Sequence, residues 1–162
     1  MLTPKQEKFR LAFLSPFKQR LYFAKNLPMA LLSGTKLVSF SEQSAVATVP
    51  FKHLTKNPFN STYFAVMSMA AELSTAAPAM LALKGSEADI ALIIVDFLAE
   101  FLKKAQSKTT FVSHDFHKFQ SAISNLKNPG DSASVSAKTI GTNSAGEEVA
   151  CFYFTWSFKR RS

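Results

Sequence analysis

A long, almost uncharged segment is the feature that most constrains the fold of this chain. Between Lys56 and Lys84 the only charged residue is Glu72, which lies among small and apolar side chains. Such a run is typical of a helix buried in a protein core, and we expect this helix to cover at least residues 63–77. Burying a carboxylate is unfavourable unless it has a partner or a task. The sequence therefore predicts a core helix whose one acidic side chain needs an explanation.

The same segment is nearly long enough to cross a membrane, because about 20 apolar residues span a bilayer. Glu72 argues against this, since an acidic residue at the centre of a span costs about 2.5–3.5 kcal/mol. The first eight residues also lack the apolar core of a secretory signal. The single cysteine, Cys151, excludes an internal disulfide and fits a reducing compartment. We expect a cytoplasmic protein without a transmembrane segment.

Length and composition indicate one packed domain, residues 1–162. Hydrophobic residues make up 47% of the chain and charged residues 19%, which is enough apolar material for a core. The net charge of +8 favours anionic partners, although a solvated basic surface explains it equally well. Nucleic acid is disfavoured, because the aromatic residues beside the C-terminal basic run Lys159–Arg161 alternate as in a buried strand.

Residues 1–33 are predicted to form a helical extension. Apolar residues recur every fourth position at Phe9, Phe13, Phe17 and Leu21, and basic residues lie off this face. We expect Ser15-Pro16 to divide the segment into two short helices. Such basic amphipathic helices can pack on the protein's own core or bind a membrane surface, and core packing is the commoner use.

The remaining pattern predicts an α+β fold with five to six antiparallel strands around the long helix. Two-residue alternation and turn signals predict strands near 35–41, 45–51, 109–113, 132–139 and 149–158. A short helix is expected to begin at His114 or Asp115. The segment 90–104 suits a strand or a helix, and its dense Ile and Val favour a strand. As a strand it would present one set of side chains on one side: Ile90, Leu92, Ile94, Asp96, Leu98, Glu100 and Leu102.

A long apolar helix that follows two strands and is cradled by an antiparallel sheet resembles the hotdog fold. Many acyl-CoA thioesterases of this fold carry an Asn, then a His-Gly-Gly turn that opens the helix, then an acidic residue about two and a half turns further on. Asn57 takes the Asn position here, Tyr63-Phe64-Ala65 the turn and Glu72 the acid. Beyond the first thirty residues the chain also resembles a thioesterase-like hotdog family of unknown function, through three segments: Asn57–Glu72, Phe101–Ala105 and Phe152–Lys159.

This resemblance implies a homodimer or higher homo-oligomer, joined edge to edge, that acts on an acyl-CoA thioester without a cofactor. Glu72 would be the base or nucleophile, and Asn57 or Asn60 would orient water or hold the carboxylate. The backbone N–H groups of Tyr63 and Phe64 would polarise the thioester carbonyl. The phosphates of coenzyme A would be bound by two basic residues, Lys103 and Lys104.

The sequence departs from the thioesterase pattern at the helix opening. Glycines allow a ligand close to the backbone, whereas Phe64 and Ala65 restrict that approach. Two functions stay open: a thioester hydrolase and a non-catalytic protein that binds acyl chains or lipids. For Glu72 itself, a purely structural role as a buried acid also stays open. A metal site is not predicted, because His114 and His117 would need the distant His53 as a further ligand. Ser68, Ser74 and Cys151 carry no nucleophile motif.

Overall fold

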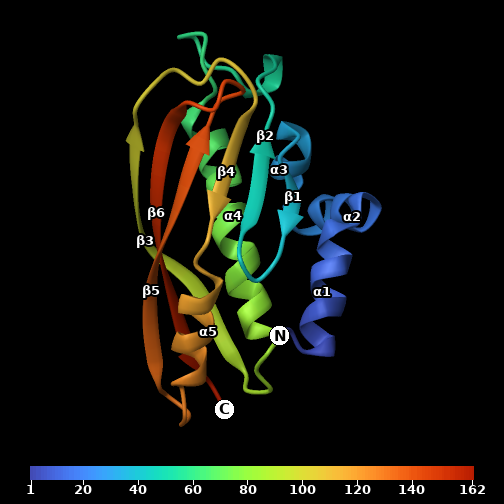
Figure 1. Cartoon of the computed structure of the whole chain (residues 1–162), viewed down its shortest axis with the longest axis vertical. Helices are drawn as coiled ribbons and strands as arrows, with labels where there is room; N and C mark the ends of the chain where they lie inside the picture. The colour runs from blue at the N-terminus through green and yellow to red at the C-terminus, as the bar shows by residue number, and fades with distance from the viewer.

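The computed structural model describes all 162 residues and contains one six-stranded antiparallel sheet that curves around helix α4 (Figure 1). The strands lie in the order β1-β2-β4-β5-β6-β3. The predicted α+β fold, with N-terminal helices before a sheet and a long central helix, is confirmed. The elements are α1 (Pro4–Leu14), α2 (Pro16–Asn26), α3 (Pro28–Ser33), β1 (Lys36–Phe40), β2 (Ala45–Val49), η1 (His53–Thr55), α4 (Phe64–Leu83), β3 (Ile90–Phe101), β4 (Thr109–Ser113), α5 (Phe116–Ser124), β5 (Ser132–Thr142) and β6 (Glu148–Arg160).

Helix α4 packs against β1, β2, β4, β5 and β6. Its many alanines bring the backbone close to the sheet, where β6 supplies a row of buried aromatic side chains. Two buried polar contacts fix its position: the Ser74 hydroxyl donates to Thr139 Oγ1 at 2.8 Å, and Trp156 Nε1 donates to Thr75 Oγ1 at 3.1 Å. By length and composition α4 could cross a membrane, but most of it is buried inside this fold, as expected of a core helix.

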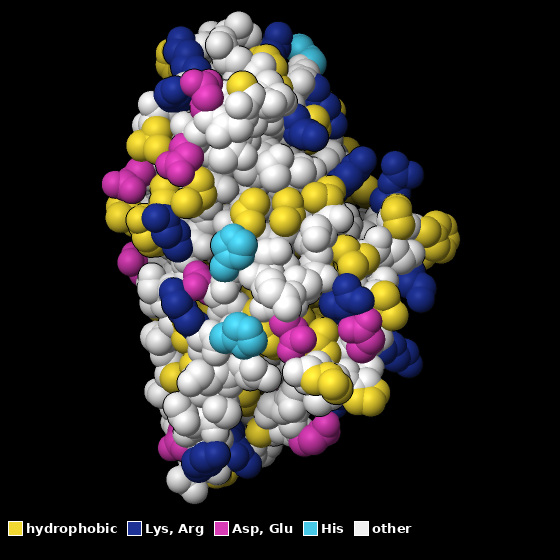
Figure 2. All heavy atoms as spheres, viewed as in Figure 1, with side chains coloured by type: hydrophobic (Ala, Val, Ile, Leu, Met, Phe, Trp, Pro, Cys, Tyr) yellow, Lys and Arg dark blue, Asp and Glu magenta, His cyan; other side chains and the backbone are white.

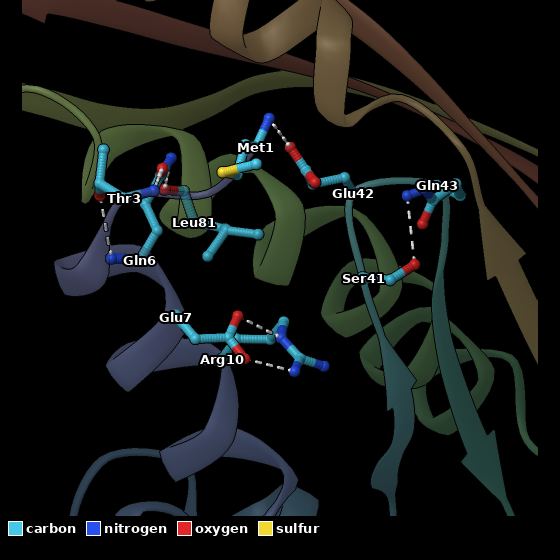
Figure 3. A network of polar contacts seen from close by, with 9 residues as sticks. All are labelled: Met1, Thr3, Gln6, Glu7, Arg10, Ser41, Glu42, Gln43 and Leu81. Carbon is cyan, nitrogen blue, oxygen red and sulfur yellow. Dashed lines mark hydrogen bonds and ion pairs between the residues drawn. The ribbon is translucent and has the colours of Figure 1, made fainter.

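Helix α1 is tied to the end of α4 and to the β1–β2 turn (Figure 3). The Gln6 side-chain amide donates to the Leu81 carbonyl at 3.0 Å, and Thr3 and Gln6 form a capping box at the start of α1. Arg10 forms an ion pair with Glu7 at 2.6 Å and also donates to the Phe40 carbonyl. These contacts hold the N-terminal extension firmly against the domain.

The predicted break at Ser15-Pro16 occurs, but the single apolar face expected across it is wrong. Phe13 is buried, whereas the side chains of Phe17 and Leu21 are 71% and 56% exposed. Pro16 starts a new helix with a different direction, and α2 instead buries Phe23 and Gln19. The Gln19 amide donates to the carbonyls of Phe13 and Leu37.

The segment 90–101 is a strand, but a β-bulge between Ile94 and Asp96 changes its alternation. Ile94 lies opposite the buried Trp156, and beyond the bulge Phe97 lies opposite Phe154. One extra residue on a strand moves all later side chains to the other face. The expectation that Asp96, Leu98 and Glu100 share a side with Ile94 is therefore wrong.

Candidate active site

The site begins at the first turn of α4, which has no side-chain cap. The helix starts at Phe64 with Tyr63 as its N-cap residue. Neighbouring backbone holds the turn instead. The Thr62 N–H and hydroxyl both donate to the Ala105 carbonyl, at 2.8 and 2.9 Å, and the Tyr63 N–H donates to the Thr55 carbonyl at 2.7 Å.

Two backbone donors at this turn remain free. The N–H groups of Phe64 and Ala65 have no acceptor within the chain. The helix dipole adds partial positive charge at the same place, which favours a developing oxyanion. Because the Tyr63 N–H is already engaged, the available pair is Phe64 and Ala65 rather than Tyr63 and Phe64. The prediction took the helix to begin at Tyr63, whereas it begins at Phe64. Placing the first helical residue correctly would have identified the Ala65 N–H as the second free donor.

A cavity of about 570 Å³ lies at this helix start. Of the predicted site residues it brings together five, from the loop before α4 and the segment after β3: Asn57, Tyr63, Phe64, Lys103 and Lys104. Lys103 forms an ion pair with Glu147 at 2.6 Å. Lys104 has no carboxylate partner and donates only to the Phe59 carbonyl, at 3.4 Å. The lysines therefore leave one unneutralised cation at the cavity.

The two asparagines shape the loop before the helix. Asn57 Oδ1 accepts hydrogen bonds from the N–H groups of Phe59 and Ser61 and from the Ser61 hydroxyl. Asn60 adopts a left-handed conformation with φ of 56°, and its carbonyl accepts from Gln106. Neither side chain hydrogen-bonds to Glu72, so the chain does not by itself provide the predicted asparagine–carboxylate contact.

Glu72 lies eight residues further along α4, about 12 Å from Phe64 along the helix axis. It borders a different cavity, of about 250 Å³, which is lined mainly by apolar side chains of α4 and by residues 26–30 at the α2–α3 junction. Its carboxylate forms no hydrogen bond or ion pair within the chain, and burial raises its pKa. This lining could not be predicted from local sequence patterns, because Glu72 and the α2–α3 junction are about forty positions apart in the chain.

This unpartnered carboxylate yields a prediction about stability. Because folding raises the Glu72 pKa, the free energy of unfolding falls as pH rises from the ordinary glutamate pKa through the raised value. Glu72→Gln removes the ionised form, so its melting temperature should exceed that of the parent protein at about pH 8. The difference should vanish below the ordinary glutamate pKa. Equal melting curves at every pH would contradict an effect of burial on Glu72.

His114, considered above as part of a possible metal site, and its neighbour Asp115 have ordinary structural contacts. His114 Nδ1 lies 2.9 Å from the Gln43 carbonyl oxygen. Asp115 accepts the Lys138 N–H at 2.7 Å and forms an ion pair with Lys118. No group of three or more His, Cys, Asp or Glu side chains is placed to hold a metal ion.

No protein-family model matches this chain, and no curated protein is similar to it in sequence. Solved structures are similar in fold. A protein of unknown function from Pseudomonas aeruginosa, described as a probable thioesterase, has a TM-score of 0.74 at 17% identity over 90% of this chain and 97% of its own. A protein of unknown function from Chlorobaculum tepidum has a TM-score of 0.76 at 13% identity, over 93% and 99%. A thioesterase from Haemophilus influenzae has 0.65 at 16%, over 89% and 90%.

These similarities define the fold. The sheet around α4 is the hotdog fold of thioesterase-like proteins, as the sequence resemblance predicted. At these identities the similarity concerns the fold alone.

Proposed function

We propose that this protein is a cytoplasmic thioesterase that hydrolyses acyl-CoA-like thioesters. The observation that carries the proposal is the pair of free N–H groups at the uncapped start of α4, where Phe64 lines a cavity bordered by lysines. Donors aimed at the position of a developing oxyanion are the main source of acceleration in acyl transfer. The basic rim at Lys103 and Lys104 suits the phosphates of coenzyme A.

In the proposed reaction the thioester carbonyl oxygen accepts hydrogen bonds from the N–H groups of Phe64 and Ala65. Glu72 takes a proton from a water molecule, and the resulting hydroxide attacks the carbonyl carbon. The C–S bond of the tetrahedral intermediate then breaks and the coenzyme A thiolate takes back the proton held by Glu72, so that the carboxylic acid and the coenzyme A thiol are released. A carboxylate with a raised pKa is a stronger base than an ordinary one, which suits this role.

Glu72 cannot serve the N–H pair of its own helix, because about 12 Å separates them along the axis. We therefore propose that the protein acts as a homodimer and that Glu72 of the partner subunit completes each site. Strand β3 supports this assembly. It forms one edge of the sheet, and five of its apolar side chains are more than half exposed: Ile93, Val95, Phe97, Leu98 and Phe101.

Edges of this kind are rarely left open. Natural edge strands are protected by charged side chains, proline, bulges or short length, whereas β3 has twelve residues, no lysine or proline, one bulge and only two acidic side chains among its apolar ones. Phe97 and Phe101 lie on the same side as α4, yet each side chain is about half exposed. A second β3, paired antiparallel, would satisfy the free backbone groups and cover the apolar side chains.

The test is release of free thiol from acyl-CoA esters of increasing chain length. We expect at least one chain length with kcat/KM of about 10⁴ M⁻¹s⁻¹ or more. Absence of turnover across the series, by correctly folded dimer, would contradict the proposal.

A second candidate is a non-catalytic protein that binds acyl chains or lipids. Its support is the pair of side chains at Phe64 and Ala65, where many thioesterases have glycine, together with the apolar cavity at Glu72. Native mass spectrometry of the purified protein separates the candidates. A co-purified lipid without turnover favours the binder, whereas an empty protein with turnover eliminates it.

A further inference from the structure

Helix α2 presents an exposed amphipathic face that the proposed thioesterase site does not use. Between its terminal residues, six of its side chains are exposed: Phe17, Lys18, Arg20, Leu21, Ala24 and Lys25. Successive residues of a helix are about 100° apart, which places Phe17, Leu21 and Ala24 together in the centre of this face. Arg20 lies on one flank, and Lys18 and Lys25 lie on the other. We call these six residues the α2 face.

The charge of this region has one sign. No acidic residue occurs between Glu7 and Glu42, and Glu7 is already paired with Arg10. None of the basic residues of the α2 face forms an ion pair. Figure 2 shows hydrophobic and basic side chains side by side on the protruding right-hand flank, where Figure 1 places α2.

We propose that the α2 face binds the surface of a membrane that contains anionic lipids. Apolar side chains in the centre of a helix face enter the boundary between headgroups and acyl chains, while flanking Lys and Arg contact anionic headgroups. Charge complementarity favours this occupant over a second copy of the chain, because two such basic faces would repel each other. The helix also protrudes from the body of the fold, which suits contact with a flat surface (Figure 1).

The proposed strand pairing through β3 does not involve α2. The N-terminal helices pack beside β1, and β1 and β3 are the two opposite edges of the sheet. Pairing through β3 therefore leaves the α2 face accessible. The residues that follow α2, 26–30, line the Glu72 cavity, so binding through α2 would place that cavity close to the membrane surface.

The test is sedimentation of the full-length protein with vesicles of phosphatidylcholine alone or mixed with phosphatidylglycerol. We expect binding to the mixed vesicles to be at least about tenfold tighter. Lys18→Gln/Arg20→Gln/Lys25→Gln and Phe17→Ser/Leu21→Ser should each weaken it by about tenfold or more. The control Lys127→Gln/Lys159→Gln/Arg161→Gln removes the same charge from exposed positions elsewhere and should bind like the parent protein.

Three outcomes would overturn the proposal. The first is no binding to mixed vesicles, and the second is equal weakening by the charge-matched control. The third is loss of the parent's oligomeric state in Phe17→Ser/Leu21→Ser, measured by sedimentation velocity, because it would make the α2 face a contact between protein chains. Circular dichroism of each variant establishes that it is folded, and none of these outcomes depends on thioesterase activity.

Discussion

Glu72→Gln is expected to reduce kcat for acyl-CoA hydrolysis by about 10²–10⁴-fold. The amide has nearly the shape of the carboxylate but cannot accept a proton from water. KM should change little, because the N–H groups at Phe64 and Ala65 and the lysines at the cavity rim are untouched. The measurement is steady-state thiol release from the preferred acyl-CoA.

The matched control is Glu87→Gln, which alters an exposed carboxylate whose partner is the surface residue Lys5. It should retain the parent rate. Unfolding cannot explain a loss in Glu72→Gln, because removing the unpartnered charge is expected to stabilise the protein at neutral pH and above. If Glu72→Gln turned over like the parent, Glu72 would not be the base.

The pH profile gives an independent readout of the same residue. Since burial raises the Glu72 pKa, the active carboxylate is lost as pH falls through that raised value. The acidic limb of the kcat profile should therefore lie above the ordinary glutamate pKa.

The second large effect concerns the dimer. Ile93→Lys/Leu98→Lys places two cations on the exposed edge strand and should weaken self-association by about 100-fold or more, equivalent to roughly 3 kcal/mol. Activity should fall with the dimer, because each site would lose the partner's Glu72. Sedimentation velocity and thiol release measure the two losses. Val38→Lys, at an exposed position on the opposite edge strand β1, should affect neither.

Mixing two inactive variants tests whether the carboxylate comes from the partner. Phe64→Pro removes one free N–H while remaining compatible with the first helical position, where proline is favoured. Phe64→Ala keeps the N–H and controls for loss of the ring. Mixed with Glu72→Gln, Phe64→Pro should restore roughly a quarter of the parent rate, because half of the dimers are mixed and each has one intact site. No recovery from mixed dimers would mean that both groups act within one chain.

The sequence was informative wherever burial imposes a regular period. The run of small residues around Ala70 and Ala71 predicted the core helix, and the alternation from Phe152 to Phe158 predicted a strand. The failures lie where one backbone feature alters that period. Pro16 turned the apolar positions of α2 outward, and the bulge after Ile94 reversed the faces of β3.

The site was only partly predictable for a related reason. The residues at the start of α4 are close in sequence, so their spacing placed Asn57, Tyr63 and Phe64 in one cavity. The surroundings of Glu72 depend on how α3 folds back on α4, which no local pattern encodes. Which N–H groups remain free also depends on Thr55, whose carbonyl accepts a hydrogen bond from the Tyr63 N–H. No local pattern in the sequence predicts this contact.

The paired hydrogen bonds from Thr62 to the Ala105 carbonyl have a mechanical consequence. They join the loop before α4 to the segment that carries Lys103 and Lys104, and the Tyr63 bond ties the same loop to η1. These bonds hold the walls of the cavity in fixed positions relative to one another, so the distance from the free N–H groups to the lysines is also fixed. Ligands would be selected by whether the distance between their anionic end and their carbonyl group matches it, without the closure of a lid.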